Sequence, residues 1–128
     1  MVRTLVALGM LAGASCSSEA PDGVFFPTTG NMNSYPSALI EGTLQERDGC
    51  VFIESEENLV LVLWPEGFRV ERDGAELRIV GGIGHPEHST GQPLELGGGS
   101  ADLPFAQELI GEQIPARCRA AGYWIASP

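Results

Sequence analysis

The sequence predicts a mainly β fold, a small OB-like antiparallel β-barrel that carries one short helix. Three observations support this class. Apolar and polar residues alternate along several short segments, which is typical of strands with one buried face. Asp-Gly pairs at 48–49 and 73–74 separate such segments, and this dipeptide favours hairpin turns. The run LVLVLW at 59–64 is apolar throughout, as expected of a strand covered on both faces. An open antiparallel sheet is the alternative.

The first half of the domain is expected to consist of short strands joined by tight turns. In ALIEGTLQE, residues 38–46, every second side chain is small or apolar, which predicts a half-buried strand. The second strand is expected at 50–55 and the third at 59–64, where Pro65 ends it. A second hairpin is expected over 68–80, because apolar side chains alternate on both sides of its Asp-Gly pair.

Three further elements are expected after the second hairpin: a glycine-rich loop at 81–93, a short strand at 94–97 and a final strand at 123–127. Between the last two, residues 101–113 have weak helical character, with Asp102 as a possible N-cap. Gly42 and the glycines at 97–99 fit positions where barrel strands bend sharply.

Residues 1–15 have the anatomy of a signal peptide and are set apart from the fold. MVR provides a positive n-region, and TLVALGMLAGA provides an apolar h-region that is too short to cross a bilayer as a helix. Residues 16–35 are rich in Ser, Pro, Gly, Thr and Asn, which predicts a flexible tether. The folded domain is expected at 36–128.

Two kinds of cleavage could remove the leader, and they differ in whether Cys16 receives a lipid. The segment GASC that ends at Cys16 resembles the bacterial lipobox, in which cleavage occurs just before a cysteine that carries a diacylglyceryl thioether. Ala14 and Ser15 fit that pattern, whereas Gly13 stands where Leu or another larger aliphatic residue is usual. The resemblance implies lipid attachment at Cys16. Ordinary signal peptidase could instead cleave after AGA at 12–14, which would leave a secreted protein.

Cys50 and Cys118 remain for the folded part, and we expect them to form a disulfide. An even pair of cysteines in an exported domain of this size is typical of a structural bridge. Closing a loop of about 70 residues stabilises a fold by roughly 3 to 4.7 kcal/mol in the chain-entropy model. A catalytic thiol and a pair of metal thiolates are the alternatives, but no motif for either lies near these cysteines.

The charge of the chain argues against a nucleic-acid partner. It has 17 acidic residues and seven arginines with no lysine, which gives a formal net charge of −10 at pH 7. Binding a phosphate backbone requires Lys or Arg to displace its counterions. The same charge disfavours an anionic lipid surface, except through a covalent anchor. The acidic residues are dispersed, which indicates a solvated surface and not a polyanionic tail.

The segment GHPEHSTG at 84–91 is the best local candidate for a site. His85, Glu87 and His88 offer imidazole and carboxylate ligands of the kind that zinc or another divalent metal takes. Pro86 keeps the two histidines off a helix, so they lack the geometry of an H-E-x-x-H site. An exposed polar loop is the simpler interpretation, and no cofactor is predicted.

Trp64, Tyr123 and Trp124 are candidates for an aromatic ligand face, because OB barrels often bind ligands on an open face lined with such groups. Phe52 and Phe68 could belong to the same face. The simpler interpretation is burial in the core, since a small domain has few large side chains to bury. Trp64 stands beside Pro65 at a strand end and is expected to be the most exposed of the three. The glycine-rich segments match neither a phosphate loop nor a G-x-S-x-G elbow, and no catalytic residue is nominated.

Five segments together look like a set of small bacterial exported proteins and lipoproteins of unassigned role. They are YPSALIEGTL, DGCVFIE, LVLVLWPEGF, LGGGSADL and IPARC…GYWIAS, and they lie within roughly 35–126. The shared features are an E-G-x-L strand, a G-C-V strand, a W-P-x-G turn, an L-G-G-G segment and a terminal Cys before Tyr-Trp. The resemblance implies an extracytoplasmic domain, often with a membrane anchor.

The leading hypothesis is a lipoprotein of the bacterial cell envelope that is anchored to a membrane by lipid. It would act as a binding or envelope-interaction module for a protein or small-molecule ligand, without catalysis. The alternative hypothesis is a small metal-dependent hydrolase or metal-binding protein that uses the loop at 84–91.

Overall fold

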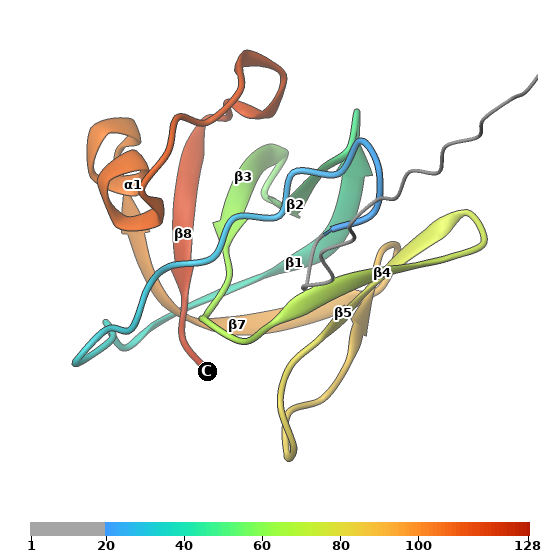
Figure 1. The fold of residues 1–128 in the computed structure, drawn as a ribbon, viewed down its shortest axis with the longest axis horizontal. Coiled ribbons are helices and arrows are strands. Elements are labelled where there is room, and N and C mark those ends of the chain that lie inside the picture. The colour runs from blue at the N-terminus through green and yellow to red at the C-terminus, as the bar shows by residue number, and fades with distance from the viewer. Residues whose placement is uncertain (1–19) are drawn as a thin grey trace, which may run out of the picture.

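A computed structural model describes residues 20–128 (Figure 1). These residues contain eight strands, one α-helix and one short 3-10 helix. The elements are β1 (Ala38–Arg47), β2 (Cys50–Ser55), β3 (Asn58–Leu63), β4 (Arg69–Asp73), β5 (Glu76–Val80), β6 (His88–Ser89), β7 (Pro93–Ala101), α1 (Leu103–Ile110), η1 (Ala116–Cys118) and β8 (Gly122–Ala126). The predicted mainly β class with one short α-helix is confirmed.

Five strands close into a barrel in the order β1-β2-β3-β8-β7, and β7 pairs again with β1. Four of the five pairings are antiparallel, but β3 and β8 run parallel, with Val62 beside Trp124. The parallel pair arises because the segment with α1 and η1 carries the chain back before β8 enters between β3 and β7 (Figure 1). The closed barrel is therefore confirmed, and the narrower OB-like label stays a prediction.

Strand β7 is longer than predicted because the glycines at 97–99 continue it. Gly98 has a φ of 143°, and a Cβ atom there would collide with the carbonyl of Ile125 in β8. A Cβ at Gly42 of β1 would likewise collide with the carbonyl of Glu54 in β2. Both glycines thus let neighbouring strands approach more closely than any side chain would allow.

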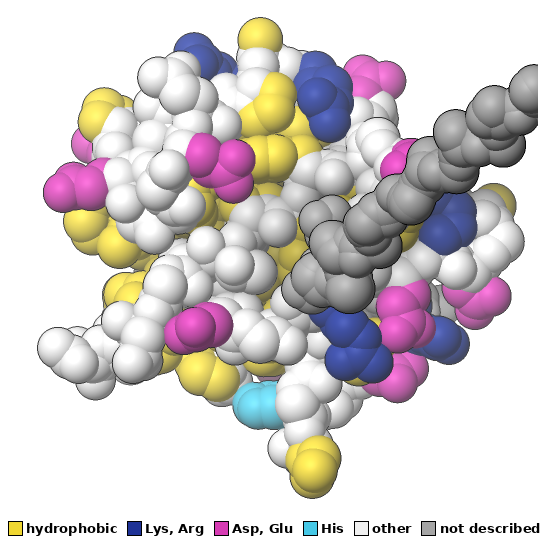
Figure 2. Space-filling view, in the orientation of Figure 1, with side chains coloured by type: hydrophobic (Ala, Val, Ile, Leu, Met, Phe, Trp, Pro, Cys, Tyr) yellow, Lys and Arg dark blue, Asp and Glu magenta, His cyan; other side chains and the backbone are white. Residues whose placement is uncertain are grey.

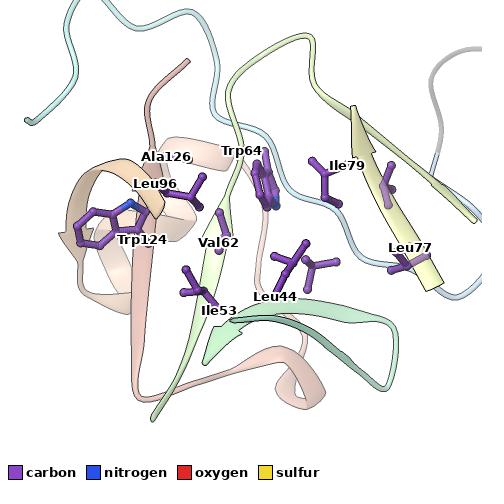
Figure 3. Packing of buried hydrophobic residues seen from close by; sticks show 11 residues of the cluster. Leu44, Ile53, Val62, Trp64, Leu77, Ile79, Leu96, Trp124 and Ala126 are labelled. Atoms are coloured by element: carbon purple, nitrogen blue, oxygen red, sulfur yellow. The ribbon is translucent and has the colours of Figure 1, made fainter. Parts of the chain in front are cut away.

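The strands β4, β5 and β6 form a separate three-stranded sheet beside the barrel. Leu77 and Ile79 of β5 are fully buried and share one hydrophobic cluster with Leu44 and Trp64 (Figure 3). The backbone N–H of Leu44 also donates to the carbonyl of Gln92 at 3.0 Å. The second sheet is therefore part of the same core as the barrel, although its strands do not join the barrel ladder.

Cys50 and Cys118 are joined by a disulfide, with their Cα atoms 5.5 Å apart, and the predicted pairing is confirmed. Both residues are fully buried, in a second hydrophobic cluster that also holds Phe52 and Leu61. The bridge links the start of β2 to η1, so it fixes the connection between α1 and β8 to the barrel wall.

The sequence predicts a flexible tether over 16–35, but in the described part of that stretch the chain packs on the barrel. The backbone N–H of Phe25 donates to Gly49 at 2.8 Å, and that of Thr29 donates to Trp64 at 2.9 Å. The ring of Phe26 stacks on Trp64 with centroids 5.8 Å apart. The segment VFF at 24–26 is apolar, so its burial against the barrel is favourable although the residues around it are polar. We call residues 24–29 the strap.

The helix α1 is shorter than the 101–113 expected, and its caps explain the bounds. The side chain of Asp102 accepts a hydrogen bond from Phe105 N at 3.0 Å, which confirms the predicted N-cap. Gly111 ends the helix in the left-handed region, with a φ of 76°.

The turn between β2 and β3 carries an unfavourable pair of residues. Glu56 and Glu57 both have positive φ, at 54° and 71°, a conformation that costs non-glycine residues about 1 kcal/mol each. Asp48 and Gly49, in the preceding hairpin, have similar φ values, 55° and 79°.

Replacing both glutamates of the β2–β3 turn, Glu56→Asn with Glu57→Gly, should raise the free energy of unfolding by about 1 kcal/mol, measured by urea denaturation. Asp48→Asn is the control, with little change expected; an unaltered midpoint in the double variant would contradict this account.

Candidate functional site

A surface cavity of about 190 Å³ brings together residues from distant parts of the chain. We call it the imidazole cavity. Its principal lining side chains are Trp64, Phe68, His85, His88, Glu95 and Leu96, and residues 126–128 complete the wall. Histidine atoms are visible in cyan at the lower edge of the molecule in Figure 2. Trp64 follows β3, Phe68 precedes β4, the histidines lie in and before β6, and the remaining wall comes from β7 and the end of β8.

Three larger hollows have volumes of about 570, 430 and 330 Å³. The first two adjoin Gly42 in β1, and their linings contain no aromatic ring. The third lies beside the strap and includes Phe26, Phe68 and Arg69 in its wall, but no histidine. Size alone therefore favours these hollows, but ligand sites in proteins usually combine apolar or aromatic walls with a few polar groups. The imidazole cavity combines two aromatic rings with both histidines of the chain, so we treat it as the candidate site.

The rings of Trp64 and Phe68 line the imidazole cavity and belong to a group of stacked aromatic rings. The indole of Trp64 stacks with Phe26 of the strap and with Phe68, with centroid distances of 5.8 and 6.1 Å and interplanar angles of 15° and 23°. His85 packs against Phe68 at 5.3 Å, and His88 packs against Trp64 at 6.5 Å. Ring packing thus orients both imidazoles, which leaves their nitrogens as the polar groups of an otherwise largely apolar wall.

Burial lowers the pKa of His88 below its usual 6.5, because the partly enclosed imidazole loses hydration when it is charged. At neutral pH His88 is therefore neutral, with one ring nitrogen that donates and one that accepts a hydrogen bond. His88 therefore contributes a neutral imidazole to the cavity wall.

This shift in pKa predicts that acid weakens the fold through His88. A lowered folded-state pKa means that the stabilising contribution is present above the unfolded value of 6.5 and is lost as pH falls through the folded pKa. The free energy of unfolding of the wild type should therefore fall more steeply than that of His88→Gln as the pH is lowered below about 6.5. Parallel urea titrations at several pH values measure both slopes. Equal slopes would contradict the assignment.

The predicted trio His85, Glu87 and His88 does not assemble into a metal site. The two imidazoles line one cavity, but Glu87 is not among its walls, and its carboxylate lies 3.7 Å from Nε of Arg78. Within residues 20–128, no group of three or more His, Cys, Asp or Glu side chains is placed to hold a metal ion. Glu87 lies just before β6, and its carboxylate lies beside Arg78 of β5, whereas the His88 side chain lines the cavity.

The predicted aromatic ligand face of Trp64, Tyr123 and Trp124 does not form, because these side chains are only 1%, 5% and 7% exposed. Tyr123 and Trp124 are successive residues of β8, so they belong to the two different hydrophobic clusters. Trp64 was expected to be the most exposed of the three and is the least. The barrel uses all three as core, and only Trp64 also reaches a cavity wall.

Sequence reasoning missed Glu95, and it included Phe68 among the possible ligand-face aromatics without linking it to the loop at 84–91. Phe68 lies just before β4, and Glu95 lies on the outer face of β7. The sequence predicts a strand at both places. No local pattern joins these two residues to the loop at 84–91, since the juxtaposition depends on how the second sheet docks on the barrel.

The chain matches no protein family model, no curated protein and no solved structure. Among the helices of residues 20–128, none has the length and apolar character that crossing a membrane requires.

Proposed function

We propose that this chain is a lipoprotein of a bacterial cell envelope, anchored by a lipid on Cys16, whose barrel binds a ligand outside the cytoplasm. The imidazole cavity is the proposed ligand site. The proposal joins the sequence of the leader, the covalent bridge of the barrel and the shape of that cavity.

The observation that carries the location is the disulfide between Cys50 and Cys118. Both sulfurs belong to fully buried residues, so the bridge is part of the core and not an exposed redox couple. Structural disulfides form and persist in oxidising compartments and are rare in the cytosol. This supports export of the folded part, and export is the role expected of the residues 1–15 that precede Cys16.

The strap sets how far the barrel would stand from the lipid. Cys16 precedes Ala20, the first described residue, by four positions, and a chain of that length spans at most about 14 Å. The strap that follows packs on the barrel, with Phe26 against Trp64. A lipid on Cys16 would therefore hold the barrel close to the membrane surface, within reach of lipid-phase or envelope partners. Diacylation gives stable anchoring where one acyl chain would be marginal.

The binding role is supported by the walls of the imidazole cavity. Apolar and aromatic surface with a small number of polar groups is the usual composition of small-molecule sites. Here the polar groups are the two imidazoles and the carboxylate of Glu95. Packing of the histidines on the aromatic stack fixes their position before any ligand arrives, which reduces the entropy lost on binding.

Metabolic labelling with an alkyne fatty acid tests the anchor. The wild-type protein should incorporate the label and sediment with membranes, and Cys16→Ser should lose both properties because no other residue carries the thioether. The double variant Cys50→Ala/Cys118→Ala is the control and should retain the label. Label that persists in Cys16→Ser, or wild-type protein that is exported without any label, would contradict the proposed anchor.

A further inference from the structure

The charges around the imidazole cavity point to the class of its ligand. Glu95 is the one lining residue with a formally charged side chain, and no arginine lies in the wall. Arg78, in the neighbouring sheet, is already paired with Glu71 at 2.8 Å. An anionic ligand would therefore meet a carboxylate and find no cation, whereas a cationic ligand would find a partner.

A second observation is that the strand neighbour of Glu95 is another carboxylate. In the register of β1 and β7, Glu95 stands directly opposite Glu41. Like charges at directly opposed positions destabilise a sheet, and this neighbour raises the pKa of Glu95 through a carboxyl–carboxyl hydrogen bond and Coulomb repulsion. A cation bound beside Glu95 would relieve this repulsion. Glu95 is the member of the pair that lines the imidazole cavity, and it also lines the 570 Å³ hollow together with Glu41.

The other walls suit a cation that carries an apolar body. Phe68 and Trp64 contribute aromatic rings to the wall, and the face of such a ring attracts a cation that lies within about 6 Å of the ring centroid. Leu96 adds aliphatic surface, and His88, neutral at pH 7, adds a hydrogen-bond acceptor without a competing positive charge. The volume of about 190 Å³ is smaller than that of a typical drug-sized site, which suits a small ligand.

We infer that the imidazole cavity binds a small organic cation, a primary amine with an apolar body, whose ammonium group pairs with Glu95. This inference rests on the proposed function, because it assumes that the cavity is a ligand site. A bare divalent metal fits less well, since no group of three metal-ligating side chains is assembled within residues 20–128.

The two histidines of the chain provide the readout, because both line this cavity. The full-length exported protein is titrated with benzylamine, benzyl alcohol and benzoate at neutral pH, while the imidazole signals are followed by NMR. Benzylamine should shift both imidazole signals saturably, benzyl alcohol should bind about tenfold more weakly, and benzoate should cause no shift.

Glu95→Gln should weaken benzylamine binding about tenfold and leave benzyl alcohol binding unchanged, since only the charged partner is lost. Glu108→Gln, an exposed carboxylate on α1 outside the cavity, is the matched control and should bind as the wild type does. Folding of each variant is verified from the same spectra.

Three results would overturn the inference, and they differ in what else they affect. Benzyl alcohol or benzoate binding as tightly as benzylamine would reject the amine and leave a binding cavity in place. Zn²⁺ that shifts both imidazole signals and displaces benzylamine would replace the amine by a metal. No shift with any probe would reject both the amine and the proposed binding role of the cavity.

Discussion

Removing the disulfide with Cys50→Ala and Cys118→Ala together should lower the free energy of unfolding by about 2–5 kcal/mol. The bridge joins residues 68 positions apart, so its loss frees a long stretch of the unfolded chain. It also fixes η1 to the start of β2, where Arg117 Nε donates to the carbonyl of Asp48 at 2.9 Å. Losses of this size are a large fraction of the about 5–15 kcal/mol that holds a domain together.

Urea denaturation followed by circular dichroism measures this loss. The double variant is preferred to either single one, because a lone buried thiol could form mixed disulfides and blur the transition. Treating the wild type with a reductant under partly denaturing conditions should reproduce the lower midpoint. An oxidised wild type and a double variant that unfold at the same urea concentration would show that the bridge contributes nothing to stability.

Trp64→Ala should lower the free energy of unfolding by about 3–5 kcal/mol, the range for deleting a large core aromatic ring. The indole is 1% exposed and stacks with Phe26 and Phe68. Its cluster includes buried residues of both the barrel and the second sheet, so the cavity left by alanine would loosen three parts of the molecule: barrel, second sheet and strap. The imidazole cavity would lose one of its aromatic rings as well.

Trp64→Phe is the matched control. Nε1 of Trp64 is buried without a hydrogen-bond partner among the described residues, so phenylalanine removes ring volume but no hydrogen bond. The loss of stability should be clearly smaller than for alanine. Thermal unfolding and limited proteolysis at the strap read out both variants. An alanine variant within about 1 kcal/mol of the wild type would contradict the placement of this ring.

Most of the barrel follows from local sequence signals. The alternation in residues 38–46 predicted β1, and the apolar run at 59–64 predicted β3. The Asp-Gly pair at 48–49 predicted the turn that follows β1, where both residues have positive φ. The disulfide followed from cysteine parity and the expected compartment, and the N-cap of α1 from one aspartate. These signals are short-range, and a single segment is enough to read them.

The candidate site could be predicted only in part, because it depends on long-range docking. His85, His88 and Trp64 stand out as residue types, but their convergence requires the second sheet to share a core with the barrel. The strap was obscured for a related reason. Its composition resembles a linker, and only the barrel surface around Trp64 makes burial of Phe26 favourable.

The mass of the mature chain, isolated from the cell that makes it, tests the central claim most directly. The account predicts a chain that begins at Cys16, carries the added mass of acyl groups on that residue, and yields a Cys50–Cys118 peptide pair without reduction. A chain that retains Met1, has three free thiols and carries no lipid would contradict it.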